Sequence, residues 1–371
     1  MGWSWQIAKV AGIPIRVHAT FLIFIVFIYV ALAQGQGPAV ALETVAFFLA
    51  IFGCVVLHEL GHALTARRYG VRTRDITLLP IGGVARLERI PEKPSQEIAV
   101  ALAGPAVNVL IAGVLLAIFV GGGGTLSPEN LGTLEGGFLE RLLAYNVFLA
   151  LFNLIPAFPM DGGRVLRALL ATRLDYLRAT RIAANVGQGI ALLFVIWGIK
   201  VGNPFLLFIA LFVFIGAGQE AQAVQMRSAF EGVPVSRAMI RDFRTLRGDE
   251  PLSRAVELLL SGHQQDFPVL GSNPAGPVLG ILTRADLLTS LASGRTDRRI
   301  DEVAKRSCGT AHPREMLEGV FHRMQENGCP AVPVIEADGS LVGMVTLENV
   351  GELAMVQAAL GGTRRGGSGP A

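Results

Sequence analysis

Long apolar runs dominate the chain before residue 225. A helix needs about 20 mostly apolar residues to cross a hydrocarbon layer of ~30 Å, because each residue advances it by ~1.5 Å. About six runs have this length: 15–33, 44–66, 98–120, 138–156, 182–200 and 204–224. The composition agrees, since 51% of the 371 residues are hydrophobic and only 16% are charged. We therefore expect a multi-span α-helical membrane protein.

The charged residues between these runs indicate an orientation in the membrane. Lysines and arginines gather after the second run and after the fourth, whereas segments 34–39 and 121–137 contain neither. Because positively charged loops stay on the cytoplasmic side, we expect both termini and everything after residue 225 to face the cytoplasm. The net charge of +3 is small for this length, and the sequence carries no nucleic-acid-binding signature. Membrane lipid is therefore an expected partner, and nucleic acid is not.

The composition changes to that of a soluble domain after residue 225. Segments 266–291 and 331–356 repeat one pattern: a strand, a turn rich in Gly or Asp-Gly, a second strand and a helix that begins near Thr283 or Thr346. The pattern predicts an α/β domain built from two copies. The expected parts of the chain are 1–225, 231–294, 300–358 and a disordered Gly-rich tail at 361–371.

The three cysteines are scattered and lack the Cys-x-x-Cys spacing that is typical of zinc sites. They are Cys54, Cys308 and Cys329. This spacing argues against a disulfide framework. We expect all three to be buried and to pack as small apolar side chains.

The second apolar run contains three ionisable residues, in the stretch VVLHELGHAL at 55–64. His58 and His62 are four residues apart, so a helix places both imidazoles on one face, with Glu59 beside them. Two such histidines suit a tetrahedral zinc ion that also holds a third protein ligand and a water, which Glu59 can deprotonate. The alternative is an amphipathic helix that turns a polar face to solvent. Ionisable groups inside a membrane span are costly and usually functional, which favours the zinc site.

The best candidate for a third ligand lies in the stretch FNLIPAFPMDGGRVLRALL. Here an apolar run stops at Pro156, is broken again at Pro159 and resumes as a helix after Gly163. Non-helical backbone at membrane depth is tolerated only where protein or a water-filled cavity satisfies its polar groups, so we expect Asp161 beside a polar cavity. The alternative role for Asp161 is to cap the helix that follows it, and both roles can coexist.

These two stretches, in this order, resemble the motifs of the site-2 protease family of intramembrane zinc metalloproteases. The family pairs His-Glu-x-x-His with an Asn-x-x-Pro-x-x-Pro-Leu-Asp-Gly stretch, and the likeness extends over about residues 10–225. The resemblance implies that His58, His62 and Asp161 bind one zinc ion per chain. It also implies that Glu59 is the general base.

Other positions within the same resemblance receive weaker expectations. Asn153 matches the family's asparagine, which helps to position the substrate or its developing oxyanion. Met160 stands where leucine is usual, which is a volume-conserving exchange. His18 matches a family histidine, although a lone histidine at a membrane interface is more often an anchor. Asn108 is expected to satisfy the backbone of a kinked helix. Segment 81–88 reads as an exposed strand, to which an unwound substrate could add as a further strand.

The repeated half resembles a tandem pair of CBS domains, the regulatory modules named after cystathionine β-synthase. In that family a Gly-h-h-[Ser/Thr]-x-x-Asp stretch holds an adenosine nucleotide, with the hydroxyl on phosphate and the carboxylate on ribose. GILTRAD matches this stretch, which implies that Thr283 and Asp286 bind ATP or AMP. GMVTLEN keeps Thr346 but carries Asn349 in place of the acid, which weakens the case for a second site. The alternative is a capped helix that serves only dimerisation or partner contact.

The two resemblances together imply a membrane zinc metalloprotease of a prokaryotic cell membrane. It would cleave anchored regulatory proteins in or near their membrane spans, under control of adenine nucleotide and as a homodimer through the CBS pair. One rival is a CBS-regulated transporter of metal ions, which is disfavoured because the two halves of 1–225 do not match each other. Another is a catalytically silent scaffold that senses nucleotide. It is disfavoured because Glu59 is needed for chemistry but not for metal binding.

Overall fold

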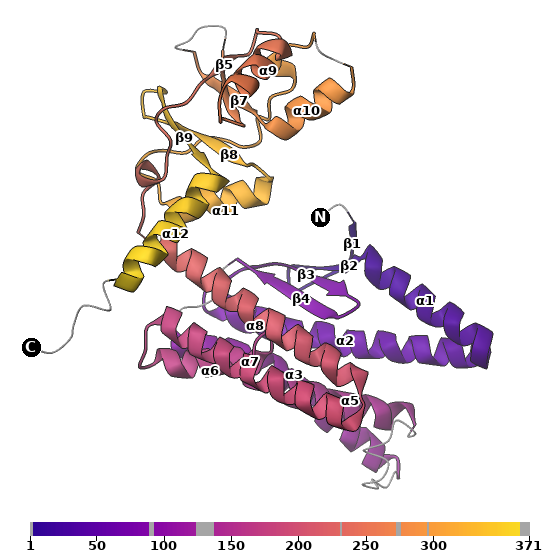
Figure 1. Ribbon diagram of the computed structural model, residues 1–371. Helices are drawn as coiled ribbons and strands as arrows, with labels where there is room; N and C mark the ends of the chain where they lie inside the picture. The colour runs from indigo at the N-terminus through magenta and orange to yellow at the C-terminus, as the bar shows by residue number, and fades with distance from the viewer. Residues whose placement is uncertain are drawn as a thin grey trace, which may run out of the picture. The chain divides into compact units, whose positions relative to one another are not determined.

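The computed structural model describes residues 3–88, 93–123, 137–230, 232–271, 276–294 and 297–363. The chain divides into two compact units, Met1–Val224 and Gln225–Ala371 (Figure 1). Most of segment 121–137, and the expected tail from residue 364 onward, lie outside the described residues.

Among the described residues, five helices are long and apolar enough to cross a membrane. They are α1 (Ala19–Gln36), α2 (Pro38–Arg68), α3 (Pro94–Gly121), α7 (Tyr176–Val201) and α8 (Pro204–Phe230). This confirms the multi-span helical membrane fold. The fourth predicted run instead forms α5 (Phe138–Asn153), whose 16 residues reach only ~24 Å.

The chain between α5 and the next helix, α6 (Asp161–Ala171), is not helical. Pro156 and Pro159 lie in this connection, and proline cannot supply the backbone N–H that a continuing helix requires. Ala157 packs in a buried cluster with Ala191 of α7 and Val213 of α8. Ala157, Phe158 and Met160 of this connection are buried, whereas Pro156 and Pro159 are exposed.

A four-stranded sheet completes the first unit, in the order β1 (Ser4–Val10), β2 (Ile13–His18), β3 (Thr73–Leu79) and β4 (Gly82–Leu87). β2 and β3 are parallel, and the two outer pairs are antiparallel. Ile13 and Ile76 pack against Leu60 and Ala63 of α2, so one face of the sheet covers the helix that carries His58. The strand expected at 81–88 is β4, and it forms an edge of the sheet.

The second unit contains the expected pair of strand-turn-strand-helix copies. The first copy is β6 (Phe267–Leu270), β7 (Val278–Leu282) and α10 (Arg284–Ala292), and the second is β8 (Ala331–Ile335), β9 (Leu341–Thr346) and α12 (Leu347–Thr363). The helices that precede them are α9 (Leu252–Ser261) and α11 (Leu317–Asn327), and the short strand β5 (Leu246–Arg247) pairs with β6. The amphipathic patterns therefore form helices that pack against short sheets.

The expectation for the cysteines was wrong at two positions. Cys308 and Cys329 form a disulfide, whereas Cys54 is buried and free. Both bonded residues belong to a buried cluster that also contains Ile281 of β7 and Met344 of β9. Packing of the two copies brings the cysteines together across 21 residues of sequence, and spacing alone does not reveal such a contact.

Candidate metal centre

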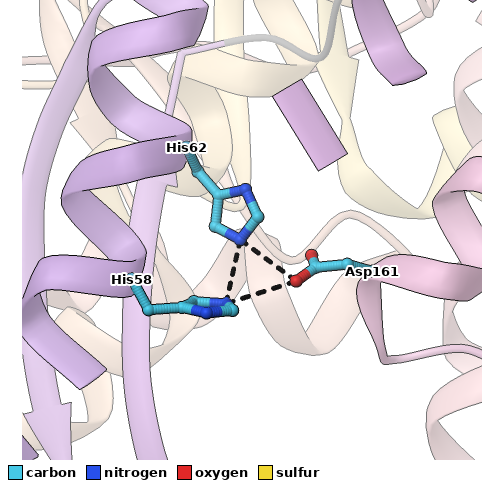
Figure 2. Close-up of side chains that lie close together, drawn as sticks. All are labelled: His58, His62 and Asp161. Atoms are coloured by element: carbon cyan, nitrogen blue, oxygen red, sulfur yellow. Dashed lines mark hydrogen bonds and ion pairs between the residues drawn. The ribbon is translucent and has the colours of Figure 1, made fainter. Parts of the chain in front are cut away.

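Three side chains that are distant in the sequence converge inside the first unit. His58 and His62 project from α2, and Asp161 is the first residue of α6. Asp161 Oδ2 lies 3.2 Å from His58 Nε2 and 3.1 Å from His62 Nε2. The two Nε2 atoms lie 3.1 Å apart, and all three side chains are buried (Figure 2). α6 has Met160 as its N-cap residue, without a side-chain cap bond, so the Asp161 carboxylate faces the histidines instead of capping the helix.

A chain of buried amides fixes the proton on His58. The carbonyl of Leu142 can only accept, so Asn146 Nδ2 donates to it, at 2.9 Å. Asn146 Oδ1 then accepts from Asn108 Nδ2, at 3.1 Å. Asn108 Oδ1 is therefore turned toward His58 Nδ1, 2.6 Å away, and accepts its proton. The order of donors along this chain places the proton of His58 on Nδ1 and leaves a lone pair on Nε2.

The second histidine is oriented by backbone. His62 Nδ1 lies 2.7 Å from the carbonyl oxygen of Val100, which can only accept, so His62 also carries its proton on Nδ1. When both imidazoles are neutral, their Nε2 lone pairs and one carboxylate oxygen of Asp161 face one another. Such a set of electron-rich atoms can bind a metal cation.

The spacing of these atoms fits zinc. Three ligands that each lie ~2.05 Å from a tetrahedral zinc ion are separated by ~3.3 Å. The separations observed here are 3.1, 3.1 and 3.2 Å. The donor set, two neutral imidazoles and one carboxylate, is also a common one for catalytic zinc.

A glycine on α3 makes room for the two imidazoles. A Cβ atom added at Gly104 would collide with the ring of His62 and would lie 2.6 Å from His58 Nε2. Real Cβ atoms do not approach other atoms so closely. Gly104 therefore lets α3 pass directly over the convergent nitrogens.

Glu59 lies on α2 between the two histidines and is half-buried. Its Oε2 accepts a hydrogen bond from the N–H of Ala85 on β4, at 3.2 Å. A Cβ atom added at Gly83 would lie 2.9 Å from Glu59 Cγ, so the absence of a side chain there allows β4 to approach α2. The edge strand of the sheet therefore passes beside the carboxylate that was predicted to be the general base.

The remaining predicted residues of this unit, Asn153 and His18, have hydrogen-bond partners within or at the end of their own helices. Asn153 is the last residue of α5, and its Nδ2 donates to the carbonyl of Leu149 in the same helix, at 3.0 Å. His18 is the N-cap residue of α1, where its Nδ1 accepts from the N–H of Thr20. His18 thus caps the N-terminus of the first membrane-spanning helix.

The expectation for Asn108 was wrong, because its side chain bonds His58 and Asn146 instead of neighbouring backbone. Sequence reasoning missed Asn146, whose one available signal was an asparagine inside an apolar run. It also missed the carbonyl of Val100, because a backbone atom leaves no signal in the sequence.

The predicted nucleotide-binding residues of the second unit cap two helices. Thr283 is the N-cap residue of α10, and its hydroxyl accepts from the N–H of Asp286 and donates to the Asp286 carboxylate, at 2.6 Å. Lys305 Nζ lies 3.7 Å from the same carboxylate. Thr346 accepts from the N–H of Asn349 in the equivalent place of the second copy. Both hydroxyls therefore have local partners.

A cavity of about 370 Å³ opens beside the second of these caps. Thr346 and Asn349 line it together with polar residues of the first copy, among them Gln264 and Asp266. Burial raises the pKa of the Asp266 carboxyl above its usual value, and the negative charge of Asp286 adds to this, against the N–H of Arg284. A second cavity, of about 690 Å³, is lined by residues that include Arg241 and Phe243.

The fold is that of a multi-span membrane protein, and the site is a His-Glu-x-x-His metal centre. Together they define the class of membrane metalloproteases. Residues 46–134 and 135–195 match the family model described as peptidase family M50, and residues 235–293 and 300–352 match the CBS domain model. The chain belongs to peptidase family M50, the site-2 protease family, and is a zinc metalloendopeptidase with a CBS pair.

Three known proteins illustrate what this chain is similar to. A zinc metalloprotease of Methanocaldococcus jannaschii is 35% identical over 281 residues, which cover 76% of this chain and 79% of that protein. Rip3 of Mycobacterium tuberculosis is 29% identical over 370 residues, which cover 94% of this chain and 92% of that protein. The solved structure of a site-2 protease from Methanocaldococcus jannaschii has 39% sequence identity and a TM-score of 0.43, and the match covers 59% of this chain and 95% of that chain.

Proposed function

We propose that His58, His62 and Asp161 hold the zinc ion and that Glu59 is the general base for peptide-bond hydrolysis. The observation that carries this proposal is the convergence of two imidazole Nε2 atoms and one carboxylate oxygen within 3.2 Å of one another. Zinc, when bound, supplies Lewis acidity to the scissile carbonyl and to the attacking water.

Glu59 acts on the proton of that water. Its carboxylate is next in sequence to His58, and its Oε2 is held only by the N–H of Ala85 among the hydrogen bonds of the described residues. A carboxylate that accepts a single N–H keeps lone pairs for a water proton. Glu59 takes this proton and returns it to the leaving amine nitrogen.

The substrate is an unwound segment of a membrane-anchored regulatory protein. Hydrolysis needs an extended peptide, because a helical carbonyl is already hydrogen-bonded and is shielded by its own turn. β4 ends the sheet beside Glu59, so an extended segment that adds to its edge would run past the catalytic carboxylate. Asn153, at the end of α5, is the proposed contact for the carbonyl oxygen of the substrate.

Substitution of Glu59 separates catalysis from metal binding. Glu59→Gln should retain zinc and lose hydrolysis, because an amide cannot take a proton while the three ligands remain. Glu43→Gln is a matched control on the same helix, since Glu43 is exposed and pairs with Arg141. Zinc content and cleavage of a membrane-anchored test protein are measured for each variant. Wild-type cleavage by Glu59→Gln would exclude the proposed base, and unchanged zinc content in Asp161→Ala would exclude the proposed third ligand.

We propose that the protein lies in a prokaryotic cell membrane with its basic segments, its termini and the CBS pair in the cytoplasm. The distribution of lysine and arginine supports this orientation. A single cysteine introduced at the exposed position Arg173 tests it with a membrane-impermeant maleimide. Labelling in intact cells, and not only in inverted vesicles, would show that the orientation is the opposite of the proposed one.

Adenine nucleotide binding in the second unit is the proposed means of regulation. The cavity of about 370 Å³ beside Thr346 and Asn349 supports it, because a lining that mixes apolar side chains such as Phe243 with polar ones such as Gln264 suits the base and ribose of a nucleotide. Thr283 and Asp286 are the candidates for a second nucleotide. A homodimer formed through the CBS pair belongs to the same proposal, and the mass of the detergent-solubilised protein in light scattering tests it.

A further inference from the structure

Arg167 is completely buried although an arginine side chain is permanently charged. It lies on α6, six residues after Asp161, and it has two carboxylate partners on other helices. Its Nε donates to Glu97 Oε1 of α3 at 2.7 Å, and its Nη1 donates to Glu220 Oε1 of α8 at 2.5 Å. One guanidinium therefore joins three helices that are distant in the sequence.

The same guanidinium contacts the segments at both ends of α6. It lies 5.0 Å from the ring centre of Phe158 and 5.0 Å from that of Tyr176. Phe158 belongs to the non-helical connection that leads into Asp161, and Tyr176 begins α7. Arg167 thus fixes the entry to α6 as well as the helix itself.

These contacts link the backbones that carry the zinc-binding groups. Glu97 lies three residues before Val100, whose carbonyl orients His62. α6 begins with Asp161. Glu97 and Arg167 therefore hold the segment that orients one ligand against the helix that carries another.

Stability alone does not account for this arrangement. Moving charged groups out of water costs several kcal/mol per ion, and apolar replacements of buried ion pairs are often at least as stable. An arginine with a rigid fork of donors does, however, fix the distance and angle between the backbones it joins. A tetrahedral metal site is sensitive to such distances.

We propose that Arg167 is a positioning residue, which sets the distance from Asp161 to His58 and His62, and that Glu220 makes α8 part of this support. The proposal rests on the proposed zinc site.

Glu220→Gln is the most informative variant for this proposal. Glu220 is about one-quarter exposed, and its neutralisation leaves Arg167 paired with Glu97, so the fold should survive. We expect zinc affinity to fall about 10-fold, since loss of outer support typically costs ~10–100-fold. The absorption spectrum of the cobalt-substituted protein should shift, and kcat should fall with KM unchanged. Arg167→Lys should weaken zinc binding as well, because an ammonium group cannot span both carboxylates with the same geometry.

Glu43→Gln is again the matched control, because it removes a carboxylate that pairs with Arg141 at 2.6 Å elsewhere in the unit. It should change neither zinc affinity nor the cobalt spectrum. A Glu220→Gln variant with wild-type zinc affinity and cobalt spectrum would overturn the inference, even if its Tm were lower. His62→Ala separates the two proposals: zinc loss in His62→Ala with no effect of Glu220→Gln refutes only the role of Arg167, whereas wild-type zinc binding by His62→Ala refutes the zinc site itself.

Discussion

His58 donates its Nδ1 proton to Asn108 Oδ1 at 2.6 Å, across 50 residues of sequence and inside the membrane unit. The bond determines which nitrogen of His58 is available to a metal. It depends in turn on Asn146, which holds the Asn108 amide in the required orientation. The metal centre is therefore supported by α3 and α5 as well as by the helices that supply its ligands.

Asn108→Leu should lower zinc affinity by about 10–100-fold, because His58 would lose the acceptor that selects its tautomer. Asn108→Asp keeps an acceptor at the same place and should bind zinc better than Asn108→Leu. Competition with a zinc chelator measures both affinities. Equal affinities of the leucine, aspartate and wild-type proteins would show that this bond does not orient the ligand.

Gly104→Ala should abolish zinc binding, since the added methyl group would occupy space between the two imidazoles. Gly113→Ala is the control, because a Cβ atom at Gly113 on the same helix has nothing within 4 Å. Zinc content after purification distinguishes them. Normal zinc content in Gly104→Ala would mean that α3 can move away from the ligands.

Asn153→Ala should keep zinc and slow hydrolysis by ~10²–10³, as expected for loss of one oxyanion contact. Asn185→Ala, which changes an exposed asparagine on α7, should have no effect. Single-turnover cleavage rates provide the comparison. Loss of zinc from Asn153→Ala would point to a structural role at the end of α5 instead.

Local rules predict the pairing of His58 with His62 and the break before Asp161, whereas the approach of Asp161 to His62, across 99 residues, was implied by the family resemblance. His58 and His62 are related by the period of one helix, and two prolines announce the break before Asp161. The buried partners of these residues could not be found in this way. Asn108 and His58 are separated by 50 residues, and Arg167 and Glu97 by 70, so only the packing of helices reveals that they touch.

The CBS pair shows a different limit of sequence reasoning. A hydroxyl followed three residues later by an acid or amide has the same spacing whether it binds phosphate or caps a helix. Sequence reasoning favoured the first copy because Asp286 is acidic. In the structure, Asp286 is bonded to Thr283 and lies near Lys305, while the described cavity of about 370 Å³ opens beside Thr346.

Thr346→Val should therefore reduce ATP or AMP affinity of the full-length protein by roughly 10–150-fold, because a hydrogen bond to a charged group is worth ~1.5–3 kcal/mol. Thr283→Val is the matched variant in the first copy and should have a smaller effect. Calorimetric titration in detergent measures both. The opposite ranking would place the main nucleotide in the first copy, and no heat with either nucleotide would leave the pair as a module for dimerisation or docking.

The half-buried carboxyl of Asp266 gives the second unit a predictable pH dependence. Burial raises the pKa of Asp266 in the folded protein, so the folded state favours the protonated form. Stability from this group is complete below the unfolded pKa, near 3.8, and is lost as the pH rises through the higher folded value. Asp266→Asn does not titrate and can still accept the N–H of Arg284. The variant should therefore stabilise β6 and β7 at pH 7.5 and confer progressively less advantage as the pH falls toward 4. Hydrogen exchange of these strands in the full-length protein, corrected for the intrinsic rate at each pH, measures the difference. An advantage that is constant across this range would show that folding does not raise the pKa of Asp266, and one that grows toward acid would show that the folded state stabilises the carboxylate.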